Sequence, residues 1–161
     1  MPSVPTNARV SIVGAGHWML VTDRIGPRVV ESIADRYGPN VELHAIGTMP
    51  LALLDCIDGQ DLMLIVDACI AGWKPGEVRI MEPDLAQASI GGETSIHQLG
   101  PIQALVIARQ LFTDRLPKKV MMILVETEGL DDATEERACG EVVSALDTAI
   151  AALTPKGRGN E

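Results

Sequence analysis

This chain of 161 residues has few aromatic residues, no excess of basic residues and no long apolar run. Aromatic side chains make up 2% of it, so its core must be built from aliphatic residues and methionine. The formal net charge of −9 argues against nucleic acid or an anionic membrane as a partner, because both attract basic surfaces. No run is long enough to cross a bilayer, and the N-terminus lacks the pattern of a signal peptide. We therefore expect a cytoplasmic protein with no nucleic-acid or membrane partner.

Cysteine is scarce as well, with three residues and no Cys-x-x-Cys pair. Cys56 and Cys69 lie in apolar runs, which favours small buried side chains over a disulfide or a metal cluster, and Cys139 gives no other indication. No Ser-His-Asp or Cys-His pattern with a nucleophile elbow is present. The chain therefore offers no conventional nucleophile, and its free thiols fit a reducing cytosol.

Strand-like and helix-like segments alternate along one domain, for which we expect an ordered core over residues 8–153. Expected strands cover 9–13, 41–46, 62–66, 77–81 and 120–125, and expected helices cover 27–37, 50–57, 101–112 and 135–153. Residues 83–94 are expected to form a loop. This alternation predicts an α/β fold, a three-layer α/β/α sandwich with a mostly parallel central sheet and the short fourth strand antiparallel. Binding sites in such folds gather at the carboxyl ends of the strands.

The run Gly14-Ala15-Gly16 after the first strand invites comparison with a dinucleotide-binding loop. That fingerprint needs a third glycine where this chain has Met19, and an acidic residue after the second strand, which is absent here. A tight turn is therefore the better interpretation of these glycines.

Asp23, Asp67 and His97 are the candidate site residues, because each falls beside the end of a predicted strand or the start of a predicted helix. Taken singly, Asp23 and His97 are more consistent with helix-end groups, and Asp67 fits a cap or a site equally well. Together, two carboxylates and one imidazole would form a divalent-metal site with open positions. The acidic run 131–136 fits the solvated start of a helix.

The same residues resemble the nickel–iron hydrogenase maturation endopeptidases, which trim the C-terminus of the hydrogenase large subunit. The resemblance covers nearly the whole chain. It rests on Gly14-Ala15-Gly16 with the loop that ends at Asp23, on the strand ending in Asp67-Ala68, and above all on His97-Gln98-Leu99-Gly100.

The resemblance implies that Asp23, Asp67 and His97 are metal ligands and catalytic residues. The metal would be nickel carried by the large-subunit precursor, with other divalent ions such as Cd²⁺ or Zn²⁺ able to replace it. The chain would be a protease that removes a C-terminal peptide from that precursor and recognises the bound nickel. A monomer is the expected state, although no feature of the sequence bears on oligomerisation.

This chain departs from the family pattern at several positions: His17 replaces an asparagine, Thr22 replaces an acidic residue, Arg24 replaces a small residue, and Ala45 stands where a carboxylate is frequent. We expect Arg24 to compete for the charge of Asp23 and His17 to supply a fourth ligand or a supporting hydrogen bond, with an exposed loop residue as its alternative. These changes leave two other interpretations open. One is a non-catalytic relative that docks onto the large subunit and senses its metal, and the other is a plain ligand-binding domain in which both aspartates are caps.

Overall fold

A five-stranded sheet forms the middle of the molecule in the computed structural model, which describes residues 7–87 and 100–153. The strand order is β2-β1-β3-β5-β4, and all neighbours are parallel except β4 and β5. The strands are β1 (Val10–Ala15), β2 (Val41–Gly47), β3 (Leu62–Cys69), β4 (Val78–Met81) and β5 (Val120–Glu126). The expected mostly parallel sheet with an antiparallel fourth strand is confirmed.

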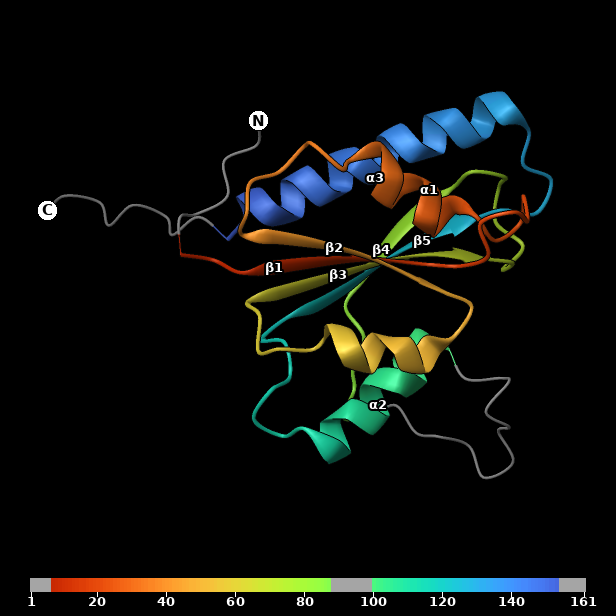
Figure 1. Ribbon diagram of the computed structural model, residues 1–161. Coiled ribbons are helices and arrows are strands. Elements are labelled where there is room, and N and C mark those ends of the chain that lie inside the picture. The colour runs from red at the N-terminus through yellow and green to blue at the C-terminus, as the bar shows by residue number, and fades with distance from the viewer. Residues whose placement is uncertain (1–6, 88–99, 154–161) are drawn as a thin grey trace, which may run out of the picture.

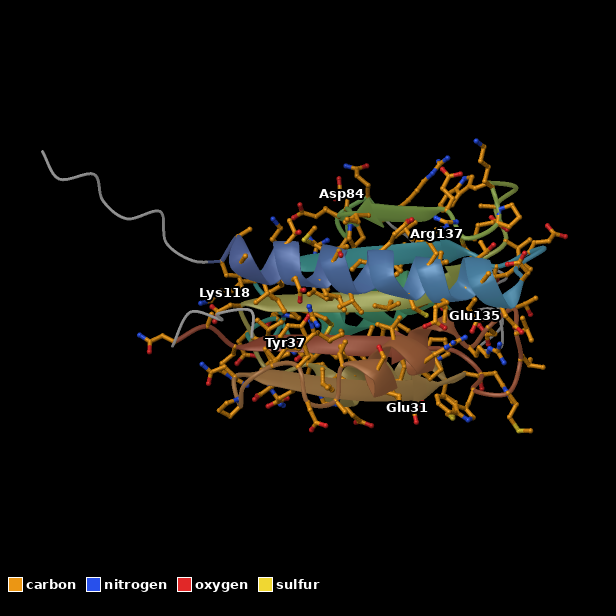
Figure 2. The ribbon with its side chains drawn as sticks, turned by 90° about the horizontal axis from the view of Figure 1, so that it is seen from above. Glu31, Tyr37, Asp84, Lys118, Glu135 and Arg137 are labelled. Carbon is orange, nitrogen blue, oxygen red and sulfur yellow. The ribbon has the colours of Figure 1, made fainter. Side chains whose placement is uncertain are left out.

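Helices cover both faces of this sheet (Figure 1). On one face lie α1 (Ile25–Ser32) and α3 (Asp132–Ala151), and on the other lie the 3-10 helix η1 (Pro50–Cys56) and α2 (Pro101–Leu111). Seen from above, α3 runs along the length of the sheet (Figure 2). The three-layer α/β/α sandwich is confirmed.

The central strand β3 supplies side chains to both cores. Leu62, Leu64 and Val66 pack into the cluster beneath α1 and α3, whereas Met63 and Ile65 pack into the cluster beneath η1 and α2. Successive side chains of a strand point to opposite faces, so a continuous apolar run is what a strand between two helical layers requires.

Several elements differ in length from their predictions, among them the first helix and the third strand. The first helix was expected to reach residue 37, but its regular bonds end at Ser32, and tighter turns follow in which Ala34 N donates to Glu31 O and Arg36 N donates to Ile33 O. The third strand was expected to end at Val66, but it continues to Cys69 because its last residues pair with β5. No helix within the described ranges is long and apolar enough to cross a membrane.

The strand order reverses at β1. The chain leaves β1 through α1 to reach β2 on one side, and then passes through η1 to β3 on the other side. The pairing of β1 with β3 ends at Gly14 and Val66, while β3 and β5 remain paired as far as Cys69 and Glu126. Asp67 is therefore the first residue of β3 beyond its pairing with β1. A crevice at such a switch point is the usual place for a ligand in an open α/β sheet.

Candidate active site

Asp23 and Asp67 border one cavity at the carboxyl edge of the sheet. The cavity measures about 180 Å³ and lies where the loops after β1 and β2 meet the end of β3 and the start of α2. Its lining also includes Gly16, Gly47, Thr48, Pro50, Gly100 and Pro101. Two residues 44 positions apart in the sequence are thus brought to one site, as the strand-edge argument predicted.

The loop between β1 and α1 holds Asp23 in place. The backbone N–H of His17 donates to Asp23 Oδ2 at 2.8 Å, and Asp23 N donates to Leu20 O at 2.9 Å. Gly16 has a φ of 133°, and a Cβ at this position would lie 1.9 Å from Asp23 O. Only glycine allows the loop to fold back so closely, so the tight-turn interpretation of Gly14-Ala15-Gly16 is confirmed.

Neither aspartate is a helix cap. The α1 helix begins after Arg24, and no side chain caps its N-terminus. Asp67 lies inside β3 rather than at the start of a helix. The interpretation of both carboxylates as caps is therefore wrong, and their common feature is the cavity.

Burial sets the electrostatics of Asp67. Removal from water is the largest cause that raises its pKa, the charge of Asp23 raises it further, and a hydrogen bond from Ala68 N partly opposes them. The resulting pKa is about 7. Near neutral pH this carboxyl group therefore favours uptake of either a proton or a cation.

His97 lies outside the described residues, and its role as third ligand stays a prediction. Gly100, which follows it by three positions in the sequence, lines the cavity. Within 7–87 and 100–153, no group of three His, Cys, Asp or Glu side chains is close enough to hold a metal ion. The two aspartates are the part of the predicted ligand set that the structure brings together.

His17 supports the site through its main chain. Its backbone N–H binds Asp23, whereas its exposed imidazole accepts a hydrogen bond from Met19 N at Nδ1, over 3.1 Å. Ligation through the remaining ring nitrogen stays a prediction.

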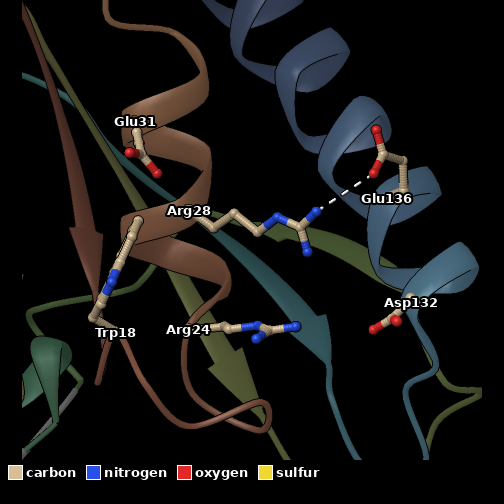
Figure 3. A pocket seen from close by; sticks show the side chains of 6 residues that line it. All are labelled: Trp18, Arg24, Arg28, Glu31, Asp132 and Glu136. Carbon is tan, nitrogen blue, oxygen red and sulfur yellow. Dashed lines mark hydrogen bonds and ion pairs between the residues drawn. The ribbon is translucent and has the colours of Figure 1, made fainter.

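Arg24 does not pair with Asp23, which corrects the expectation that it competes for that charge. Its guanidinium makes two hydrogen bonds of 3.0 Å to Glu135, at the start of α3, and Arg28 binds the same carboxylate. Burial opposes the charge of Glu135, but the hydrogen bonds from Arg24 and Arg28 outweigh it and lower the pKa of Glu135. Figure 3 shows both arginines reaching from the α1 segment toward α3.

The same contacts correct the interpretation of residues 131–136 as a wholly solvated helix start. Glu135 is 1% exposed and closes an ion-pair cluster between α1 and α3. Asp131 caps α3 by accepting a hydrogen bond from Thr134 N at 2.7 Å. The helix accordingly begins at Asp132 rather than at residue 135.

Glu126, the last residue of β5, and Thr127 after it also position the site, although neither was predicted to do so from the sequence. The buried carboxylate of Glu126 accepts hydrogen bonds from Ala71 N at 2.8 Å and Trp73 N at 3.3 Å, and these backbone donors lower its pKa. Thr127 Oγ1 donates to Thr22 O at 2.7 Å. The end of β5 therefore anchors both the loop after β3 and the loop that carries Asp23. The only sequence signal was a pair of polar residues after an apolar run.

The chain is similar in sequence and in structure to known proteins of one family. A family model described as hydrogenase maturation protease matches residues 27–156. The hydrogenase 2 maturation protease of Escherichia coli is 30% identical over 154 residues, which cover 92% of this chain and 93% of that protein. The structure of the hydrogenase maturating endopeptidase HybD from E. coli matches with a TM-score of 0.66 and 29% identity, over 88% of this chain and 93% of that one.

A more distant structure supports the fold alone. The nickel–iron hydrogenase maturation protease HycI from Thermococcus kodakarensis superposes with a TM-score of 0.65 at 24% identity, over 90% of this chain and 93% of that one.

Proposed function

Because the chain belongs to the hydrogenase maturation protease family, we propose that it removes a C-terminal peptide from the precursor of a nickel–iron hydrogenase large subunit and recognises the nickel bound there. The chain is an endopeptidase by its family. The observation that carries the proposal is the placement of Asp23 and Asp67 around one cavity at the switch point of the sheet.

The charge of the cavity supports a metal-bearing substrate. Within the described ranges, neither Asp23 nor Asp67 forms an ion pair, because Arg24 is already engaged by Glu135. The raised pKa of Asp67 indicates that the protein's own groups compensate the charge of this carboxylate poorly. A divalent ion brought by the precursor would supply the missing positive charge. Asp23, Asp67 and His97 would give it oxygen and nitrogen ligands and leave positions for groups of the precursor.

The proposed division of labour follows from these groups. Nickel held on the precursor would polarise the scissile carbonyl and fix its position against the site. The positive charge of the ion would keep Asp67 ionised, and a carboxylate oxygen not bound to the ion would accept the proton of an attacking water. Asp23, held by the main chain of His17, would keep its orientation as the substrate enters.

Two proposals about the setting accompany this function. We propose a cytoplasmic location, in keeping with three cysteines that are all free. We also propose that the protein acts as a monomer. The non-catalytic alternative has lost one of its supports, because Arg24 does not neutralise Asp23.

The test mixes the purified protein with nickel-loaded and nickel-free precursor and follows the intact mass of the large subunit. We expect the loaded precursor to lose a short C-terminal peptide and the nickel-free precursor to keep it. Equal cleavage of both would refute recognition through nickel. Cleavage of neither cognate form would favour the non-catalytic relative.

A further inference from the structure

Most of the exposed large apolar side chains lie on the loops at the carboxyl edge of the sheet, where the cavity also lies. Among the residues that the structure describes, nine such side chains are exposed, and three of these lie elsewhere, on β4 or at the end of α2. The other six belong to the loops that follow β1, β2 and β3, and we call them the apolar rim: Trp18, Met19, Leu20, Val21, Met49 and Ile70.

The rim residues lie close in sequence to the two carboxylates and to residues that line the cavity. Residues 18–21 are separated from Asp23 by one residue. Met49 stands between two residues that line the cavity, and Ile70 follows Asp67 by three positions. The backbone bond from Gly16 N to Gly47 O, at 2.8 Å, joins the first two loops beside the cavity. Directly after Ile70, the backbone N–H groups of Ala71 and Trp73 donate hydrogen bonds to Glu126. The rim is thus built on loops that the fold holds in place.

These side chains contribute little to the stability of the isolated protein, because apolar surface lowers the free energy only when it is removed from water. Met19 is 79% exposed and Trp18 is 53% exposed, so neither contributes much to the core. Because β1, β2 and β3 are parallel, the loops that follow them all lie at the carboxyl edge of the sheet. Exposed large apolar side chains gathered at one edge of a domain indicate a surface that binds another protein.

Charged groups flank the rim on one side. Trp18 also borders a pocket of about 540 Å³ between α1 and α3, lined by Arg24, Arg28 and three acidic residues (Figure 3). An apolar centre with a charged border is the usual arrangement of a protein–protein interface. A small polar solute cannot bury apolar surface against six apolar side chains, whereas a polypeptide substrate has apolar side chains that can pack against them.

We propose that the apolar rim is the docking surface for the large-subunit precursor, which would bury apolar side chains next to its scissile bond against Trp18 and Met19. This inference rests on the proposed function, since it takes the precursor as the partner. It assigns the affinity for the polypeptide to the rim and the chemistry to the two aspartates.

The test uses Trp18→Ser and Met19→Ser, with Leu111→Ser as the matched control. Leu111 is 63% exposed and ends α2, whose start borders the cavity, so the length of the helix separates it from the site by roughly 15 Å. KM and kcat are measured on the nickel-loaded precursor by intact mass. The Kd is measured by microscale thermophoresis on the nickel-free precursor, and self-association by sedimentation velocity.

We expect each rim variant to raise KM and Kd about tenfold or more, with kcat within about twofold of the wild type, because truncating a central aromatic or methionine anchor removes contact without touching the reacting groups. Leu111→Ser should match the wild type in every measurement. A Met19→Leu variant should keep most of the affinity.

Three outcomes would overturn the inference. Unchanged KM and Kd in both rim variants, while the wild type still cleaves, would refute the rim but leave the proposed function standing. An equal loss of affinity for the precursor in Leu111→Ser would show that the effect is not specific to the rim. Loss of self-association without loss of precursor binding would identify a second copy as the occupant. Rim-dependent binding without cleavage would instead uphold the rim and refute the proteolytic function.

Discussion

Replacement of Asp67 by asparagine removes a buried charge and keeps the shape of the side chain. The pKa of this carboxyl group rises from 3.8 to about 7 on folding, first through burial and then through the charge of Asp23. Each tenfold change in a protonation constant corresponds to about 1.4 kcal/mol, so ionised Asp67 opposes folding by up to about 4 kcal/mol. Water in the cavity screens part of this, and we expect asparagine to raise the free energy of unfolding by about 2 kcal/mol at pH 8.

The sign of the pH dependence follows from proton binding. Between pH 3.8 and about 7 the folded protein holds the Asp67 proton and the unfolded chain does not, so this group's contribution to stability falls as pH rises through the folded pKa. Below 3.8 both states are protonated and the contribution is fully present. Asparagine cannot ionise, and its advantage should therefore grow with pH and be largest above pH 7.

The assay is urea unfolding of metal-free protein, with chelator, at pH 5.5 and pH 8. Asp67→Asn should be more stable than the wild type at both values, with an advantage at pH 5.5 of about half that at pH 8, because pH 5.5 lies midway between the unfolded and folded pKa values. The exposed Asp55→Asn variant serves as the control and should differ little from the wild type at either pH. An Asp67→Asn variant that is less stable at pH 8, or one whose advantage is the same at both values, would refute the assignment of an uncompensated carboxylate. A site residue that weakens the fold is expected to have been kept for function.

Other substitutions test the surroundings of the site. Gly26→Ala should destabilise the protein by about 3 kcal/mol or more in urea unfolding, because its Cβ would lie 2.2 Å from Ala15 O; a loss below about 1 kcal/mol would show that the backbone yields there. Glu135→Gln should lower the free energy of unfolding by about 1–3 kcal/mol, since Arg24 loses its partner, and no change would mean that the pair contributes nothing. Ni²⁺ binding measured by calorimetry should be lost in His97→Ala, and in the wild type it should weaken below about pH 6 as the imidazole is protonated. Binding that is unchanged by the substitution would remove His97 from the ligand set.

The layered fold could be predicted because its signals are local. The apolar run at 62–66 required a strand covered on both faces, and the structure buries it in two cores. The ends of elements depend on partners instead. β3 extends to Cys69 because β5 continues beside it, and no feature of residues 67–69 alone announces that pairing.

The site could be predicted in part for the same reason. Asp67 follows an apolar strand and Asp23 precedes a helix, so topology alone brings them to one edge. The partner of Arg24 could not be predicted, because Glu135 lies 111 positions away and many acidic residues nearer in the sequence carry the same charge. The anchoring role of Glu126 likewise depends on backbone N–H groups of a loop more than fifty positions earlier.

The rate of peptide release from nickel-loaded precursor, compared between the wild type and Asp23→Asn, tests most directly whether the paired carboxylates act on a metal-bearing substrate. Asparagine can still accept the hydrogen bond from His17 N but cannot supply the charge that the ion requires. We predict a fall in rate of at least about 100-fold, with the unfolding midpoint little changed. A rate within about threefold of the wild type would contradict the account.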